Sequence, residues 1–374
     1  MRVVLTGGGT GGHIYPALAL AEELRRHDPH VNLLYVGSRT GLEGRIVPAA
    51  GIPFVAIPAR GLVGKSMMDR VRGVAALLQG MAAARKILTD ARPWVVVGTG
   101  GYVSGPVGMM AAIMGIPLIV HEQNAFPSVT NRLLSPRAAA VAVPFPAVGD
   151  AFPRARRVVV TGNPVRPAIL AADGREARRQ LALDGFRRVV LVTSGSRGAQ
   201  RINEAAHALA ASLPEDTALL WVTGERYYDD VLARLQEAGL APGPPGPLRI
   251  RPYLEEMELA LAAADLAVTR AGGISLAEVT ARGLPAVVVP SPHVTHDHQR
   301  HNARVLAGAG AAVMLEDDQC TGEALARIVG QLLADEERLA AMAAASGALG
   351  VPDAARRLAQ LVLETARQPA PRRR

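Results

Sequence analysis

The sequence predicts an α/β protein of two domains, each built on a parallel sheet that helices cover on both faces. Short apolar runs alternate with longer amphipathic segments along the chain, which is typical of strands that alternate with helices. A strand followed by a glycine-rich loop and a helix occurs twice, at residues 3–26 and 189–211. A chain of 374 residues is also too long for one ordinary core and suits two domains of roughly 150–200 residues each.

The first glycine-rich loop, Gly7–His13, follows the apolar run Val3–Leu5 and precedes a helical pattern from Pro16 to Arg26. Glycines let the backbone come close to a ligand, and a helix start offers unpaired N–H groups and the positive end of its dipole. The segment is therefore predicted to bind phosphate. His13 ends the loop at the helix start, where it is a candidate general base.

The other strands of the first half are expected at short apolar runs, at residues 32–36, 54–57, 94–98, 118–121, 141–143 and 158–161. A domain boundary follows at Gly162–Pro167, because two prolines and a glycine interrupt the pattern. The first domain is thus predicted to span residues 1–162. The linker 162–167 is its expected hinge.

The same pattern restarts in the second half. A strand at 189–193, a glycine loop at Ser194–Ala199 and a helix at 200–211 repeat the first arrangement. Further strands are expected at residues 218–222, 248–251, 266–269, 286–289 and 312–315. The second domain is predicted to span residues 163–352. A last helix within 353–367 is expected to pack back on the first domain, and residues 368–374 to form a disordered tail.

Composition narrows the class of protein. The chain is 49% hydrophobic, and its single cysteine, Cys320, excludes an internal disulfide and a cysteine-based zinc site, which favours a reducing, cytoplasmic setting. We find no signal peptide and no apolar stretch of the ~20 residues that a membrane span needs. The net charge of +8 reflects either general arginine usage or an anionic partner. Nucleic acid is disfavoured, because aromatics make up only 3% and no helix-turn-helix or zinc-finger spacing stands out.

Two other nucleotide-binding interpretations fit less well. The first loop also matches G-x-G-x-x-G, but a nicotinamide-dependent oxidoreductase needs an acidic residue at the end of the second strand. Val36–Arg39 supplies none, although Arg39 could meet a 2′-phosphate. Ala59–Ser66 nearly matches a P-loop, with Ala for the first Gly, and no apolar strand here ends in the Asp that would hold magnesium. We interpret that match as chance.

Apolar residues recur at helical spacing after residue 66, beside basic ones. The apolar set is Met67, Met68, Val71, Val74, Leu78 and Met81, and the basic set is Lys65, Arg70 and Arg72. An ordinary helix packed on the core explains this spacing. The alternative is a membrane-surface contact, in which apolar side chains enter the bilayer and basic ones meet anionic headgroups.

Histidines cluster in one later segment: His293, His296, His298 and His301 surround Asp297. His and Asp are metal ligands, but a hydrolytic metal site would need more ligands from elsewhere, and no such set is evident. Hydrogen bonds to a sugar or nucleotide, or plain surface placement, explain the cluster better. We therefore predict no metal site.

Together these motifs resemble the MurG family of glycosyltransferases. The matching stretches occur in the family's order: Gly7–His13, Gly98–Pro106, His121–Asn124, Gly162–Arg166, Ser194–Ala199, Arg270–Gly273 with Glu278, and His298–Gln299 with Asn302. The resemblance implies a GT-B fold, two Rossmann-like domains facing across a cleft. It also implies transfer of N-acetylglucosamine from UDP-GlcNAc to lipid I, forming lipid II for peptidoglycan.

The resemblance assigns residues to the two substrates. Glu278 would accept hydrogen bonds from the ribose hydroxyls, the backbone at Leu254 would read the uracil edge, and Arg166 would contact the diphosphate. The full donor set is Thr10, Gly11, Gly12, Asn124, Arg166, Ser196, Leu254, Gly273, Glu278 and Gln299. The acceptor set is Gly9, Thr10, His13, Gly100, Gly101, Tyr102 and Asn131. The second glycine loop departs from the family, because Ser194 and Arg197 replace a Gly and a Gln.

The implied mechanism is a single displacement with inversion at the anomeric carbon by the 4-hydroxyl of the N-acetylmuramoyl group. His13 is the first candidate for the base and Glu122 the second. No cofactor or metal is expected, because GT-B enzymes stabilise the leaving UDP with helix N-termini and Arg. The implied location is the cytoplasmic face of the membrane, peripherally bound to anionic lipid, with a cell-wall synthesis complex as a further partner. The alternatives are a GT-B enzyme with another lipid acceptor and a non-catalytic nucleotide-sugar-binding regulator.

Overall fold

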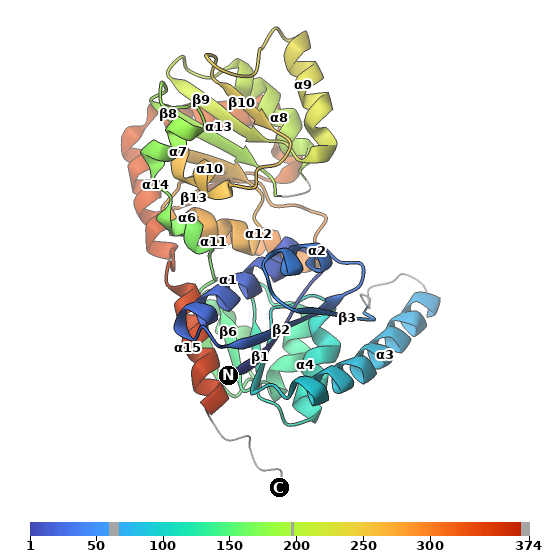
Figure 1. The fold of residues 1–374 in the computed structure, drawn as a ribbon. Coiled ribbons are helices and arrows are strands. Elements are labelled where there is room, and N and C mark those ends of the chain that lie inside the picture. The colour runs from blue at the N-terminus through green and yellow to red at the C-terminus, as the bar shows by residue number, and fades with distance from the viewer. Residues whose placement is uncertain (60–66, 196–197, 368–374) are drawn as a thin grey trace. The chain divides into compact units, whose positions relative to one another are not determined.

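The computed structural model describes residues 1–59, 67–195 and 198–367, and for residues 67–72 and Thr295 the backbone alone. The near-match to a P-loop and the C-terminal tail therefore lie largely outside the described residues. The described chain divides into two compact units (Figure 1). Unit 1 comprises residues 1–165 and the segment from residue 352 onward, and unit 2 comprises residues 166–351.

Unit 1 is a parallel sheet with the strand order β3-β2-β1-β4-β5-β6-β7. Its strands are β1 (Arg2–Thr6), β2 (Asn32–Ser38), β3 (Phe54–Ile57), β4 (Val95–Gly98), β5 (Leu118–His121), β6 (Ala140–Val143) and β7 (Val158–Val160). Its helices are α1 (Gly11–His27), α2 (Glu43–Ala49), α3 (Met67–Ala91), α4 (Ser104–Ile113), α5 (Val129–Leu134) and α15 (Ala354–Arg367).

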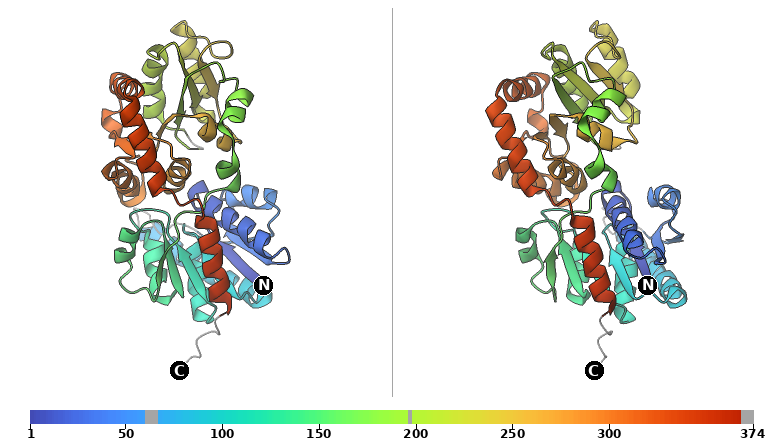
Figure 2. Two further views of the ribbon diagram at one scale, coloured as in Figure 1. Left: turned by 90° about the vertical axis from the view of Figure 1, so that its left-hand side faces the viewer. Right: turned by 60° about the vertical axis from the view of Figure 1, so that its left-hand side comes forward.

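The two faces of this sheet carry separate cores, because side chains alternate along each strand. Val3 and Leu5 pack with α1 and α2, whereas Val4 packs with α3 and α4. Helix α15 returns to this unit and lies beside α1, so that Leu358, Leu361 and Val362 fill the first of these cores (Figures 1 and 2).

Unit 2 is a second parallel sheet, ordered β10-β9-β8-β11-β12-β13. Its strands are β8 (Arg188–Thr193), β9 (Thr217–Val222), β10 (Leu248–Arg251), β11 (Leu266–Thr269), β12 (Ala286–Val288) and β13 (Ala312–Met314). Its helices are α6 (Pro167–Ala171), α7 (Gly174–Gln180), α8 (Gln200–Ala211), α9 (Tyr228–Glu237), α10 (Met257–Ala263), α11 (Gly273–Ala281), α12 (His298–Gly308), α13 (Gly322–Ala334) and α14 (Glu336–Leu349). The predicted α/β architecture with two Rossmann-like sheets is confirmed.

A buried amide links a strand of unit 2 to the helix that covers it. Asn203 on α8 accepts a hydrogen bond from Trp221 Nε1 at 2.9 Å and donates to Thr223 O at 2.9 Å. Trp221 is fully buried in the core, whereas Trp94 in unit 1 is 49% exposed. The fluorescence of Trp221 therefore reports on the packing of unit 2.

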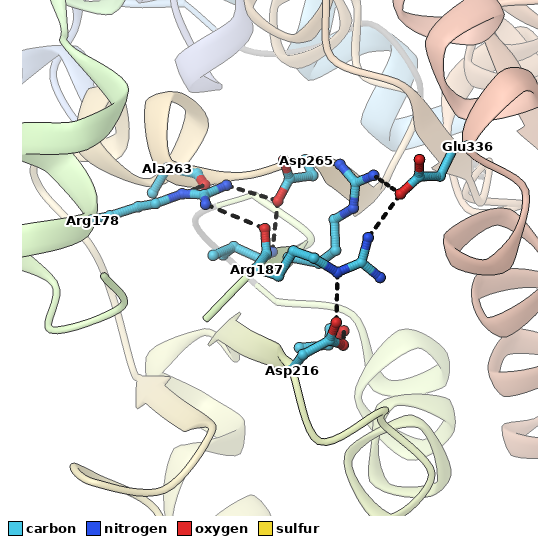
Figure 3. Close-up of polar contacts among 9 residues, drawn as sticks. Arg178, Arg187, Asp216, Ala263, Asp265 and Glu336 are labelled. Carbon is cyan, nitrogen blue, oxygen red and sulfur yellow. Dashed lines mark hydrogen bonds and ion pairs between the residues drawn. The ribbon is translucent and has the colours of Figure 1, made fainter. Parts of the chain in front are cut away.

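Charged residues tie together the amino ends of the unit 2 strands (Figure 3). Asp265 precedes β11 and accepts hydrogen bonds through Oδ2 from Arg178 Nη2 and from the Val189 backbone N–H, each at 2.7 Å. Arg187, just before β8, pairs with Asp216 at 2.5 Å and with Glu336 at 2.8 Å. These contacts lie at the opposite end of the sheet from the carboxyl ends, where parallel sheets bind ligands.

Replacing Asp265 by alanine is expected to destabilise unit 2 by about 2 kcal/mol, because a half-buried arginine and a backbone N–H both lose a charged acceptor. Urea unfolding monitored by Trp221 fluorescence, in a Trp94→Phe background, measures the loss. The matched control is Arg179→Ala, which removes an ion pair on the surface and is expected to cost much less. Equal shifts of the two unfolding midpoints would contradict this prediction.

Candidate active site

In unit 1 most of the predicted site residues lie at the carboxyl ends of β1 and β4, where the strand order reverses direction. This point of a doubly wound sheet is where ligands bind. The glycine loop leaves β1, and Thr99–Gly101 leaves β4. Thr99 Oγ1 donates to His13 O at 2.6 Å, which joins the two loops. Helix α1 begins at Gly11 rather than at the predicted Pro16, so His13 lies in its first turn.

The glycine loop rests on a buried carboxylate. Glu43 opens α2 and accepts hydrogen bonds from Ser38 N and Ser38 Oγ through Oε1, and from the Gly9 N–H through Oε2 at 3.1 Å. Tyr35 donates its hydroxyl to Gly7 O at 3.0 Å. A methyl group on Gly8 would lie 2.3 Å from Glu43 Oε1, so only a glycine fits at residue 8 beside the Glu43 carboxylate. The Gly9 N–H is thus engaged within the protein.

Three predicted acceptor residues, Gly9, Gly100 and Gly101, adopt positive φ angles of 89°, 100° and 79°. A Cβ on Gly101 would meet Gly8 O at 2.2 Å, so the two loops approach this closely only because residue 101 is a glycine. The Tyr102 ring packs against Gly9, and its hydroxyl lies 3.3 Å from Ser38 Oγ. Thr10 is the exposed N-cap residue of α1, followed by Gly11 and Gly12. The structure therefore brings these predicted residues together around His13.

Two oxygens contact the Nδ1 atom of the His13 imidazole. Its Nδ1 lies 3.0 Å from Thr99 O and 3.2 Å from Gln123 Oε1. Both partners are oxygens that only accept hydrogen bonds, so a neutral His13 carries its proton on Nδ1 and its lone pair on Nε2. A histidine in this tautomer can accept a proton through Nε2, as a general base must.

The carboxylate of Glu122, the second candidate base, already accepts hydrogen bonds from five donors. Its Oε1 accepts from Gln123 N, Asn124 N and Asn124 Nδ2, and its Oε2 accepts from Ser128 N and Asn131 Nδ2, at 2.8–3.2 Å. The side chain is fully buried. Asn131, a predicted acceptor contact, is itself 1% exposed and also donates to His121 O at 3.1 Å. Glu122 and Asn131 therefore shape the loop after β5.

In unit 2 the corresponding strand ends are those of β8 and β11. Ser194 and Gly195 leave β8 toward α8, and Gly195 has a φ angle of 78°. Ser196, a predicted donor contact, and Arg197, where the loop departs from the family, lie outside the described residues. Gly273 is the first residue of α11, which follows β11, so the N-terminus of this helix points from the same edge of the sheet.

Arg166 and Glu278, predicted separately for the diphosphate and the ribose, lie side by side. Arg166 Nε is 3.6 Å from Glu278 Oε1, and Arg166 Nη1 is 3.8 Å from Glu258 Oε2. Burial raises the pKa of Glu278 to about 7, and the positive charge of Arg166 opposes that rise. The site therefore holds a carboxyl group that changes charge near neutral pH.

Two further predicted donor contacts, Leu254 and Gln299, lie on a loop and at a helix start of unit 2. Leu254 is half-buried beside the exposed Tyr253. Gln299, in the first turn of α12, accepts a hydrogen bond from Ser291 N at 2.9 Å. Asn302 donates to Ala271 O at 2.9 Å and so holds the loop before α11.

Asp297 of the histidine cluster pairs with Arg300 at 2.8 Å, and among the described residues no group of His, Cys, Asp or Glu has the arrangement of a metal site.

Helix α3 exposes apolar side chains where it is described. Val74 is 51% and Leu78 62% exposed, while Ala84 and Leu88 face the core. Met67, Met68, Arg70, Val71 and Arg72 have no described side chains, and Lys65 lies outside the described residues. Within the described chain, no helix combines the length and the apolar character that crossing a membrane requires.

Sequence reasoning missed Tyr35, Glu43 and the role of Gln123. The sequence indicates the role of Glu43 only weakly, because this acidic residue does not lie at the end of β2. It follows that strand by five positions, and its side chain folds back to Ser38. Gln123 stood inside a recognised motif, but its contact with His13 depends on how two strand ends meet.

The chain matches two family models, the glycosyltransferase family 28 N-terminal domain over residues 3–143 and the C-terminal domain over residues 189–358. It is 45% identical to a UDP-N-acetylglucosamine–N-acetylmuramyl-(pentapeptide) pyrophosphoryl-undecaprenol N-acetylglucosamine transferase of Moorella thermoacetica, over 98% of this chain and 99% of that one. A protein of the same name from Desulforudis audaxviator is also 45% identical, over 95% of each chain.

Among solved structures, MurG of Acinetobacter baumannii is similar, with a TM-score of 0.76, 30% identity, and coverage of 97% of this chain and 99% of that one. A UDP-GlcNAc 2-epimerase of Neisseria meningitidis has a TM-score of 0.67 at 14% identity, over 97% of this chain and 100% of that one, and shares the fold alone.

Proposed function

The chain belongs to glycosyltransferase family 28 and, within it, to the MurG transferases, and from that premise we infer its reaction. It transfers N-acetylglucosamine from UDP-N-acetylglucosamine to N-acetylmuramyl-(pentapeptide) pyrophosphoryl-undecaprenol, which is lipid I, and so forms lipid II. The observation that carries this conclusion is the identity of 45% over 98% of the chain with a transferase named for that reaction.

We propose that unit 2 binds the donor. The N-terminus of α11 and the Arg166 guanidinium supply positive charge for the diphosphate, and Glu278 accepts hydrogen bonds from the ribose hydroxyls. Gln299 and Gly273 are proposed to hold the sugar and Leu254 the uracil, and the family resemblance adds Asn124 of unit 1 as a sugar contact. When the glycosidic bond breaks, UDP leaves as an anion, and the same positive groups stabilise it.

We propose that unit 1 binds the acceptor and that His13 is the base. The 4-hydroxyl of the N-acetylmuramoyl group forms the new bond to the anomeric carbon on the face opposite UDP, which inverts the configuration. The hydroxyl proton passes to His13 Nε2, whose lone pair the Nδ1 contacts define. Glu122 is a poorer base, since five donors already occupy its oxygens. Its proposed task is to hold the loop that carries Gln123 and Asn124.

Release of UDP from UDP-GlcNAc, measured with and without a lipid I analogue and in the presence of EDTA, tests this reaction. Release is expected only with the acceptor, and at the same rate in EDTA. Equal release without the acceptor would show hydrolysis instead of transfer. Loss of release in EDTA would contradict the metal-independent mechanism.

We propose that the protein acts at the cytoplasmic face of the membrane and binds it peripherally through α3. Two observations support this: the exposure of Val74 and Leu78 one helical turn apart, and the nearby basic residues of the sequence. A complex with other cell-wall synthesis proteins is a prediction of the family resemblance.

The double variant Val74→Asp/Leu78→Asp is expected to co-sediment with anionic vesicles at least about tenfold more weakly, because two apolar contacts are replaced by repelled charges. Its kcat on a water-soluble acceptor analogue should match the parent's. The matched control is Ala75→Asp/Gln79→Asp, which adds the same charges at neighbouring exposed positions without removing large apolar side chains. Equal losses for both variants would show a general charge effect and contradict a specific apolar contact.

A further inference from the structure

Gln123 is a buried amide whose orientation the surrounding backbone fixes. It is 2% exposed. Its Nε2 lies 2.7 Å from Thr99 O and 3.0 Å from His121 O. Both are carbonyl oxygens, which would repel the amide oxygen, so the nitrogen faces them. The amide oxygen, Oε1, must then face His13 Nδ1, at 3.2 Å.

His121 continues this series of hydrogen bonds, on the side of Gln123 that faces away from His13. Its Nδ1 lies 2.8 Å from Gln123 Nε2 and therefore accepts, sharing the two hydrogens of the amide with Thr99 O and His121 O. The proton of a neutral His121 is then on Nε2, which lies 3.4 Å from Gly162 O, an acceptor. Burial lowers the pKa of His121 to about 4, so this ring is neutral at physiological pH.

In each hydrogen bond of this series, only one of the two partners can therefore be the donor. His121 donates to Gly162, Gln123 donates to His121, and His13 donates to Gln123. Reversing any one of them would place two donors or two acceptors against each other. The residues around His13 thus specify both the plane of its ring and the nitrogen that bears the proton.

We propose that Gln123 is a positioning residue for the transfer reaction, which holds the His13 ring and keeps its lone pair on Nε2. This inference rests on the proposed role of His13 as the base. Gln123 itself is too buried to touch the substrates, and it acts through His13. Thr99 O provides a second acceptor for Nδ1, so loss of Gln123 weakens the arrangement without abolishing it.

The test is Gln123→Met, which keeps the length of the side chain and removes both of its polar atoms. The kcat is expected to fall about 10- to 100-fold, less than the full contribution of a general base, while the KM for UDP-GlcNAc stays unchanged. In protein labelled with ¹⁵N-histidine, the parent should show His13 as a single tautomer protonated at Nδ1. The variant should show a mixture, or protonation at Nε2. His13→Ala identifies the His13 signals.

Asn203→Leu is the matched control, because it also replaces a buried amide by an apolar side chain of similar size, in unit 2. It should lower the stability while leaving the His13 signals as in the parent. If Gln123→Met kept the parent's kcat and His13 signals, Gln123 would have no positioning role, and the proposed base would stand. If instead His13→Ala kept the parent's kcat, the base assignment itself would be wrong, whatever the tautomer of His13.

Discussion

Replacing His13 by alanine is expected to lower kcat about 10²- to 10⁴-fold, which is the range that a general base contributes. The affinity for UDP-GlcNAc, measured by calorimetry without acceptor, should not change, because His13 lies in unit 1 and the proposed donor contacts of highest charge, Arg166 and Glu278, lie in unit 2. A loss of rate with an unchanged donor Kd is the pattern of a group that acts in the chemical step.

His13→Asn separates the chemistry from the structure of the loop. The asparagine amide can donate to Thr99 O and Gln123 Oε1 from nearly the position of Nδ1, so the local hydrogen bonds persist. An amide cannot take up a proton, and the rate should therefore fall as far as in His13→Ala. If His13→Asn retained most of the parent's kcat, the imidazole would be serving only as a hydrogen-bond donor.

Replacing Glu278 by glutamine is expected to weaken UDP-GlcNAc binding about 10- to 100-fold, the worth of hydrogen bonds to a charged acceptor. In the parent, donor affinity should also fall as the pH is lowered from 8 to 6, because the pKa of Glu278 is about 7 and its protonated form accepts fewer hydrogen bonds. Calorimetric titration at each pH measures both effects. The affinity of Glu278→Gln should be independent of pH over this range.

The same substitution is expected to change stability in the opposite direction. The pKa of Glu278 is about 7 in the folded protein, against an ordinary value of 4.5, so between these pH values the native state binds more protons than the unfolded state. Stability therefore falls as the pH rises through this window, by a total of about 3 kcal/mol for the full shift. Glu278→Gln has no carboxyl group to titrate here, so it does not lose this stability. Its Tm should therefore exceed the parent's by more at pH 8 than at pH 5.

Glu258→Gln is the control for this pair of measurements. It also removes a carboxylate beside Arg166, at 3.8 Å, but has no proposed contact with the donor. It should keep a pH dependence of donor affinity, moved toward lower pH, because the charge of Glu258 contributes to the raised pKa of Glu278. If Glu278→Gln and the parent showed the same change of Tm between pH 5 and pH 8, the buried carboxyl would not titrate near neutrality.

The fold could be predicted largely from sequence because a buried parallel strand leaves a local signature. Short runs such as Phe54–Ile57 and Leu248–Arg251 match their strands to the residue. The start of α1 was predicted too late, since Pro16 resembles the first residue of a helix. In the structure it lies one turn inside, after glycines that are themselves helical.

The site could be predicted only as a set of residues, not as a set of contacts. The family resemblance made Glu122 the second candidate base, but whether a carboxylate is reactive depends on how many hydrogen-bond donors reach it. Here three of those donors are backbone N–H groups of the following loop. Likewise Arg166 and Glu278 are far apart in sequence, and their pairing, which sets the charge of the donor site, follows from the tertiary fold.

The place of α15 has a consequence for how the protein is made. The ribosome completes all the strands of unit 1 before it begins unit 2, but the helix that covers one face of their sheet is synthesised after unit 2. Until then the apolar surface that receives Leu358, Leu361 and Val362 has no cover. The nascent chain is thus expected to recruit a chaperone at this surface for as long as unit 2 takes to emerge. A circular permutant that begins with residues 352–367 should fold with less such help.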